Sequence, residues 1–364
     1  MKITSITAIP ISIPSQRTLT ALGIHPSFEY GVVEVETDEG ITGIGDITML
    51  WDGLGPLQCR YVNDWFGPML IGEDPTAINR CLAKMATLVE PAHPARAGIE
   101  MALWDIAGKA ADLPVYQLLG GRTRDAIPLS RSIVMGTPEE QVAQAERFVA
   151  AGYRCVKVKV GLDIDRDEAG VRAIREAMGP SLTIRTDANM GWKTPKQAIR
   201  AIKRLEPYTI HSVEQPIPPG NIDALRLVRE SVDTPIMVDE SLWGPDTALA
   251  LAKAGAVDIF NVYVHESGGL TNMRTIFAIA ALDGIQAVIG AMPELGPGTA
   301  AHVHLGVSVA NLGDFNDACG ATYLLADVIN EEWKVENGEI RPLPGPGLGI
   351  SLDPEKIARL RSDR

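Results

Sequence analysis

The chain has 364 residues, 46% of them hydrophobic, which is enough for a large core and two domains. Its formal charge of −13 argues against nucleic acid or an anionic membrane surface as a partner. No apolar run approaches the ~18 residues of a membrane span, MKITSITAIP does not resemble a signal peptide, and the four cysteines lack CxxC spacing. We therefore expect a cytoplasmic protein in a reducing compartment, without structural zinc.

Residues 1–125 have the patterns of a small α+β domain. Segments 2–13 and 30–49 predict antiparallel strands, with turn residues at the centre of EVETDEGITGIGD, and residues 95–112 predict a helix. The tail, about 326–364, returns to short strands and turns around PLPGPGLG. We expect part of this tail to complete the N-terminal domain.

From about 126 to 325 the sequence alternates β-branched runs with helical stretches. The runs begin near 128, 155, 182, 210, 236, 258, 286 and 313, and stretches such as 165–178 and 196–205 have helical spacing. Such alternation is typical of a (β/α)₈ barrel. A doubly wound open sheet is the competing fold, but the glycine-rich turn expected after its first strand is absent.

Three consecutive predicted strands end in acids. The third ends in RTDANMGW with Asp187, the fourth in VEQP with Glu214, and the fifth in VDES with Asp239. Any one of them alone could be a helix cap or a solvated loop residue. Because barrel active sites lie at the carboxyl ends of the strands, we expect the three carboxylates to converge. An all-oxygen set suits Mg²⁺, or Mn²⁺, better than zinc.

The second predicted strand, CVKVKVG, carries two lysines on one face, because side chains alternate along a strand. A single inward lysine would most simply be an ion-pair partner. We expect Lys157 and Lys159, desolvated and close together, to lower each other's pKa until one can act as a base. A lysine base beside a divalent ion suits removal of a proton α to a carboxylate, with the ion stabilising the ene-diolate.

Several motifs occur together in one known family. In chain order they are IEMALWDIAGKAADLPVYQLLGG at 99–121, KVKVG, RTDANMGW, VEQP, VDES, SGGL at 267–270, GAMPELGPGTAAHVHL at 290–305 and PGPGLGI at 344–350. This ordered set resembles the enolase superfamily, and within it the muconate lactonizing enzyme subgroup. The resemblance implies a modified (β/α)₈ barrel with an α+β capping domain, a small-molecule carboxylate substrate and, commonly, a homo-oligomer.

The resemblance also implies roles for single residues. Mg²⁺ would be held by the three acids, Lys159 would be the α-proton base, and Lys157 would be its neighbour and the partner of the substrate carboxylate. Asn189, which follows the third strand, is a further candidate substrate contact. Two N-terminal loops would close over the substrate: 15–30, with His25 and Tyr30, and 47–55, with Trp51.

One position departs from the subgroup, which normally has a second lysine at the end of the sixth strand. In IFNVYVHESGG that place is held by Tyr263, and the Asp–His dyad of mandelate racemase-like relatives is also missing. A tyrosine, with a reference pKa near 10, can donate a proton but is a poor base. The departure favours chemistry with one base, in which Lys159 removes the α-proton and returns it to a leaving hydroxide on the same face. His265, His302 and His304 are expected to be structural.

The substrate prediction rests on a further resemblance, to the bacterial cis-3-hydroxy-L-proline dehydratases, whose product is Δ¹-pyrroline-2-carboxylate. Trp51 and Tyr263 could flank the ring and its ammonium group in a cation–π arrangement. Glu294, after the seventh strand, could bind the ammonium or the hydroxyl group. The alternative for Glu294 is an ion pair with Lys157 or Lys159.

Other functions remain open at this point. One is a racemase or epimerase of proline betaine, N-acyl amino acids or dipeptides, with Tyr263 or another group as second base. A cycloisomerase of the same family is another. A Schiff-base aldolase would also use a barrel lysine beside another cation, although the acids argue against it. The last is a barrel without catalytic activity that serves as a binding protein.

Overall fold

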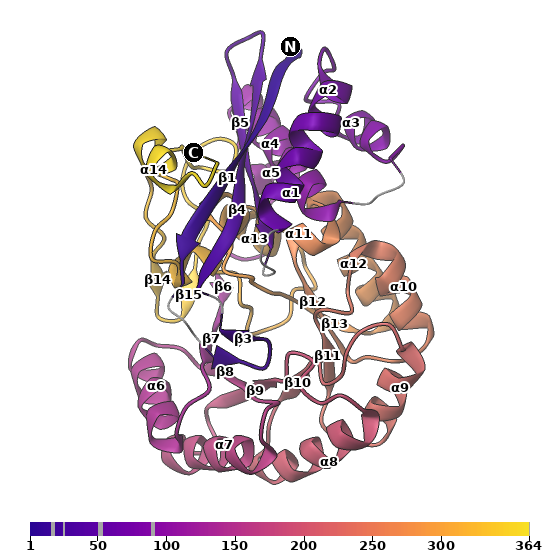
Figure 1. Cartoon of the computed structure of the whole chain (residues 1–364), viewed down its shortest axis with the longest axis vertical. Coiled ribbons are helices and arrows are strands. Elements are labelled where there is room, and N and C mark those ends of the chain that lie inside the picture. The colour runs from indigo at the N-terminus through magenta and orange to yellow at the C-terminus, as the bar shows by residue number, and fades with distance from the viewer. Residues whose placement is uncertain (16–18, 25, 50–53, 89–91, 364) are drawn as a thin grey trace.

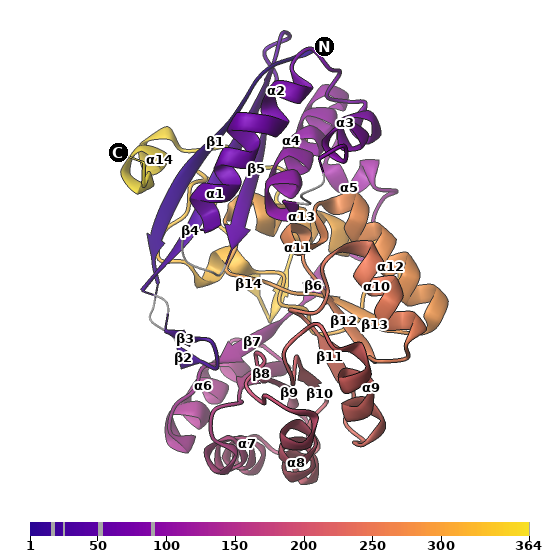
Figure 2. The same ribbon diagram turned by 45° about the vertical axis from the view of Figure 1, so that its right-hand side comes forward.

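An antiparallel sheet and a parallel sheet form the two main parts of the computed structural model (Figure 1), which describes residues 1–15, 19–24, 26–49, 54–88 and 92–363. The N-terminal sheet has the order β1-β4-β5, with strands β1 (Ile3–Pro14), β4 (Ser27–Thr37) and β5 (Thr42–Met49). All its pairings are antiparallel, as the sequence predicts. A short hairpin, β2 (Leu19–Thr20) and β3 (Gly23–Ile24), lies by the barrel strand β7 in both views (Figures 1 and 2).

Helices cover one face of the N-terminal sheet. The elements are α1 (Leu54–Arg60), the π-helical turn η1 (Tyr61–Phe66), α2 (Gly67–Leu70), α3 (Ile78–Met85), α4 (His93–Ala111) and α5 (Val115–Leu118). The predicted helix at 95–112 is α4. It packs so closely on β5 that a Cβ atom at Gly43 or Gly45 would overlap the α4 backbone.

Seven parallel strands make up the second sheet, with helices outside them. The strands are β7 (Ser130–Ile133), β8 (Cys155–Lys159), β9 (Thr183–Asp187), β10 (Ser212–Glu214), β11 (Ile236–Val238), β12 (Ile259–Val262) and β13 (Gln286–Ile289). The helices are α6 (Pro138–Ala150), α7 (Ile164–Met178), α8 (Pro195–Leu205), α9 (Ile222–Glu230), α10 (Gly244–Lys253), α11 (Val264–Ser267), α12 (Leu270–Asp283) and α13 (Gly296–Ser308), with 3₁₀ turns η2 (Glu206–Tyr208) and η3 (Gly320–Tyr323). These elements confirm the modified barrel with a separate N-terminal part.

Several barrel helices begin at the caps that the sequence provides. Thr137 and Glu140 form a reciprocal capping box at α6, Asp163 caps α7, Thr194 caps α8 and Asn221 caps α9. Each cap accepts hydrogen bonds from backbone N–H groups that the helix itself leaves unpaired. The caps fix where each strand-to-helix loop ends, and therefore the length of the loops above the site.

The predicted eighth strand, near 313, is not a strand of the structure. Residues 312–317 join their neighbours by two isolated bridges, Leu129 to Asn316 and Ala287 to Leu312, and by a hydrogen bond from Asp317 N to the carbonyl of Ile289, rather than by a continuous ladder. Phe315 lies between them with a φ of 63°, in the left-handed region that an extended strand cannot contain. The segment nevertheless lies between β7 and β13.

The tail contacts both parts of the molecule. Strand β14 (Val335–Glu336) pairs with β15 (Glu339–Ile340), which in turn pairs with β6 (Ile127–Pro128). Gly347 exchanges backbone hydrogen bonds with Leu113 and Val115. Helix α14 (Pro354–Leu360) lies next to β1, as Figure 2 shows. None of the helices in the described ranges has the length and apolar character needed to cross a bilayer.

Candidate active site

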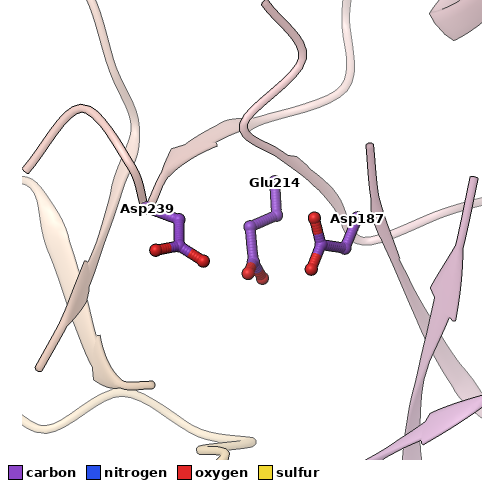
Figure 3. Close-up of side chains that lie close together, drawn as sticks. All are labelled: Asp187, Glu214 and Asp239. Carbon is purple, nitrogen blue, oxygen red and sulfur yellow. The ribbon is translucent and has the colours of Figure 1, made fainter. Parts of the chain in front are cut away.

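Three carboxylates meet at the carboxyl ends of neighbouring strands (Figure 3). Asp187 ends β9, Glu214 ends β10 and Asp239 follows β11. In the parallel register Glu214 lies beside Asp187. One oxygen from each of the three side chains lies within 4.8 Å of the others, and all three residues are buried. The structure thus brings together the acids that the sequence singled out.

The mutual repulsion of these three carboxylates favours a bound cation. Burial and the charge of Asp187 raise the pKa of Glu214 well above its usual value. Burial, Glu240 and Asp187 raise that of Asp239 to about 7. Burial also acts to raise the pKa of Asp187, but the positive charges of Lys159 and Lys157 outweigh burial, and the pKa of Asp187 is lowered. Crowded, buried, all-oxygen donors that repel one another fit a hard divalent cation.

The surroundings of Lys157 contradict the predicted direction of its pKa shift. Its Nζ lies 2.7 Å from Asp317, 3.2 Å from Glu214 and 3.7 Å from Asp187. Burial opposes the charge, yet the three carboxylates raise the pKa of Lys157 well above its usual value. The expectation that the lysine pair lowers the pKa of Lys157 is therefore wrong, because paired acids outweigh the neighbouring ammonium group.

Lys159 lies nearer to solvent than Lys157, with 15% of its side chain exposed against 4%. Its Nζ donates to Asp187 Oδ2 at 2.5 Å and to Asn189 Oδ1 at 2.9 Å. The amide of Asn189 donates in turn to Glu240 Oε1 at 3.1 Å. Of the two lysines, Lys159 is therefore the more accessible from the open end of the barrel site.

Tyr263, directly after β12, lies among the metal-ligand candidates. Its hydroxyl donates to Asp239 Oδ2 at 2.8 Å and accepts from Asn261 Nδ2 at 3.1 Å. The same Asn261 nitrogen lies 3.2 Å from Glu214 Oε1. Burial, followed by the charges of Asp239 and Glu214, raises the pKa of Tyr263 well above its usual value.

Two other predicted substrate contacts are engaged elsewhere. Tyr30 lies in β4 rather than in a loop, is 1% exposed, and donates to the carbonyl of Pro293. Glu294 accepts from Gly320 N at 3.0 Å and lies 3.2 Å from His302 Nδ1. In the described part of the chain, neither site lysine forms an ion pair with Glu294. His25 and Trp51 lie outside the described residues.

Sequence reasoning missed three residues of this site: Arg185, Asn261 and Asp317. Arg185 donates to Glu214 Oε2 at 2.9 Å and lies 3.5 Å from Asp317. Arg185 precedes Asp187 by two residues, and Asn261 precedes Tyr263 by two. The same alternation that pairs Lys157 with Lys159 would have placed both on the inner face.

The histidines form buried contacts of the kind expected of structural residues. His265 Nε2 lies 2.9 Å from Asp46 Oδ1, which joins the barrel to β5. His302 Nε2 accepts from the backbone of Val264, and His304 Nδ1 accepts from that of Tyr116. All three side chains are buried.

Three acids at the ends of successive barrel strands, with two lysines on the strand before them, define a metal-assisted enzyme of the enolase type. Residues 140–356 match the family model of the enolase C-terminal domain-like type, and residues 4–120 match the mandelate racemase / muconate lactonizing enzyme N-terminal domain. The chain therefore belongs to the mandelate racemase / muconate lactonizing enzyme family of the enolase superfamily.

Relatives in this family have different named activities. A hydrophobic dipeptide epimerase of Enterococcus faecalis is 37% identical over 83% of this chain and 87% of its own. The structure of the muconate lactonizing enzyme from Pseudomonas fluorescens with muconolactone matches with a TM-score of 0.95 at 31% identity, covering 99% of both chains. That of the Enterococcus faecalis dipeptide epimerase with Mg and L-Leu-L-Tyr has a TM-score of 0.88 at 33% identity, covering 96% of this chain and 100% of the other.

Proposed function

We propose that this protein removes the proton α to a carboxylate with Lys159 as the single base, and then expels a leaving group from the β-carbon on the same face. The hydrogen bond from the Tyr263 hydroxyl to Asp239 is the observation that carries this proposal. The hydroxyl proton is engaged by a carboxylate, and the raised pKa opposes ionisation. A group in this state is poorly suited to act as a second base on the opposite face of the substrate.

Mg²⁺ is the proposed ion, with Mn²⁺ as a possible substitute. The oxygen-only donor set supports it, as does the Mg in the dipeptide epimerase structure. Bound among Asp187, Glu214 and Asp239, a divalent ion would neutralise the substrate carboxylate and stabilise the charge of the ene-diolate.

The remaining steps fall to the side chains of the chain itself. Lys157, held cationic by its acid partners, supplies positive charge next to the substrate carboxylate. Lys159 must lose its proton before it can accept the one from Cα. The Cα–H electrons then form the ene-diolate and return to expel the β-oxygen, while the Lys159 ammonium protonates the departing hydroxide to give water.

For the substrate we propose a 3-hydroxy-L-proline. Its hydroxyl is on the β-carbon, so loss of the α-proton and of hydroxide, together as one water molecule, gives an enamine that tautomerises to Δ¹-pyrroline-2-carboxylate. In the trans isomer the α-hydrogen and the hydroxyl lie on one face of the ring, as a single lysine requires. In the cis isomer they lie on opposite faces, and the hydroxide would need a proton donor other than Lys159. The activity would make the protein a carbon–oxygen lyase.

The test is incubation of the protein and Mg²⁺ with each 3-hydroxyproline stereoisomer in D₂O, with NMR detection of pyrroline carboxylate and of deuterium at Cα. Lys159→Ala should lower both by about 10²–10⁴-fold or more, because the base is removed. Lys196→Ala, at an exposed lysine of α8, is the matched control and should leave both unchanged. Elimination that survives in Lys159→Ala would refute the role of Lys159.

An epimerase is the second candidate, favoured by the dipeptide epimerase relatives. It would exchange the α-proton of a dipeptide in D₂O and invert the centre without releasing water. A cycloisomerase, favoured by the similarity to the muconate lactonizing enzyme, also needs a base on one face only. Dipeptides and muconolactone therefore belong in the same assay, and turnover of either in place of hydroxyproline would overturn the dehydratase proposal.

A further inference from the structure

Tyr263 occupies a place of its own in the hydrogen-bond network of the acid trio. Its hydroxyl has one proton, and the neighbouring Asn261 nitrogen can only donate. The hydroxyl oxygen must therefore accept from Asn261, at 3.1 Å, and its proton must point to Asp239, at 2.8 Å. With Asp239 ionised, as a metal ligand must be, the direction of both hydrogen bonds is fixed by this chemistry.

Asn261 extends the same network to a second acid. Its Nδ2 carries two hydrogens, one for Tyr263 and one for Glu214 Oε1 at 3.2 Å. Asn261 and Tyr263 thus connect Glu214 to Asp239 through hydrogen bonds. We propose that Tyr263 and Asn261 form a hydrogen-bonded bracket that positions Glu214 and Asp239 to bind the divalent ion.

Packing around the tyrosine ring supports a positioning role. Tyr263 is 3% exposed, and a Cβ atom added at Gly290 would overlap its ring. The ring is therefore held against the backbone after β13 and has little freedom to turn toward a substrate. A fixed hydroxyl is suited to orienting a neighbouring carboxylate.

The two acids depend on the bracket to different degrees. Glu214 also receives hydrogen bonds from Arg185, at 2.9 Å, and Lys157, at 3.2 Å. Asp239 accepts a hydrogen bond from Tyr263, and its other side-chain partner is Glu214, itself one of the three acids. Loss of the tyrosine hydroxyl should therefore affect the metal site more than loss of the Asn261 amide.

The test measures metal affinity without substrate, so that it stands apart from the identity of the reaction. Mn²⁺ binding to the full chain is followed by electron paramagnetic resonance and Mg²⁺ binding by calorimetry. Tyr263→Phe should raise the Kd by about 10–100-fold, the usual effect of removing a partner that orients a metal ligand. Asn261→Leu should raise it less.

Tyr208→Phe is the matched control, because the Tyr208 hydroxyl also donates to a carboxylate, that of Glu168, but outside the barrel. It should leave the Kd unchanged. The melting temperature of each metal-free variant separates weaker binding from loss of fold, and Asn261→Leu keeps the test decisive if Tyr263→Phe does not fold. A Kd within about threefold of wild type in the folded variants would overturn the bracket.

Discussion

At the scale of single residues, the orientation of the Lys159 amine depends on one amide. Asn189 has a φ of 39°, a left-handed conformation that asparagine adopts more readily than most residues. Its Nδ2 donates to Glu240, which fixes the amide so that Oδ1 faces Lys159. Asp187 accepts from the same amine, so Lys159 is held between a metal-ligand candidate and an oriented carbonyl oxygen.

Removing this amide should slow proton transfer without disturbing the ion. Asn189→Gly keeps the left-handed backbone available and removes only the side chain. We expect Cα deuterium exchange at saturating Mg²⁺ to fall about 10–100-fold, since a small displacement of a catalytic group is costly. The Mg²⁺ Kd should change little. An unchanged exchange rate would show that Asp187 alone positions the amine.

What the sequence reveals at this scale depends on strand periodicity. The acid at each strand end is visible because it directly follows a β-branched run, and Lys157 and Lys159 because they interrupt one. Asp317 has no such signal, since its segment is not a regular strand. Without Asp317, the acid partners of Lys157 could not be counted, and the direction of its pKa shift was predicted wrongly.

At the scale of elements, the contact between α4 and β5 depends on glycine. A Cβ atom at Gly45 would overlap the backbone of Gly98 in α4, and one at Gly98 would lie 2.8 Å from the carbonyl oxygen of Asp46. Two backbones meet where no side chain separates them. Asp46, next to Gly45, then reaches His265 of the barrel at 2.9 Å.

Gly45→Ala should therefore destabilise the protein. Overpacking in a core costs about 1–3 kcal/mol, and the upper end is expected here because the clash is with backbone rather than with a flexible side chain. Chemical denaturation followed by circular dichroism measures the loss. Gly136→Ala is the comparison: the atoms nearest to its Cβ belong to the side chain of Glu140, the capping-box partner of Thr137, which can shift, so a smaller loss is expected. Equal stability of the two variants would contradict this account of the α4–β5 contact.

Strands could be predicted from the sequence where a local run of β-branched residues marks them. The run PLSRSIV and the six that follow it became strands, as their β-branched composition indicates. The run near 313 did not, because Phe315 adopts a left-handed conformation that no local pattern announces. Tyr30 stands at the end of the predicted loop 15–30 and at the start of the predicted strand segment 30–49, and it lies inside β4, so only the loop assignment is wrong.

At the scale of the whole molecule, buried polar pairs join segments far apart in sequence. Glu100 of α4 accepts from the backbone of Thr271 at the start of α12, and Asp105 accepts from that of Leu348 in the tail. Such pairs have no sequence pattern, because each partner is ordinary in its own segment. The packing of the N-terminal part on the barrel was therefore predictable only through the family resemblance.

His304 of α13 joins three of these segments and should make folding stability depend on pH. Its Nδ1 accepts from Tyr116 N after α4, and its Nε2 lies 3.1 Å from the carbonyl of Leu348 in the tail. Burial lowers the pKa of His304 to about 4 from 6.5. Between these values the unfolded chain binds more protons than the folded one, so the contribution of His304 is complete above pH 6.5 and is lost as the pH falls toward 4.

The difference corresponds to about 2 kcal/mol of unfolding free energy between pH 7 and pH 5. The glutamine of His304→Gln cannot gain a proton in this range. From pH 7 to pH 5, the unfolding free energy of this variant should therefore fall by about 2 kcal/mol less than that of wild type. Denaturant titrations of both proteins at pH 7, 6 and 5 measure this, and acidic groups common to the two cancel in the comparison. Parallel pH profiles would mean that His304 gains its proton in the folded state, and that the join between α13, α5 and the tail opens without unfolding.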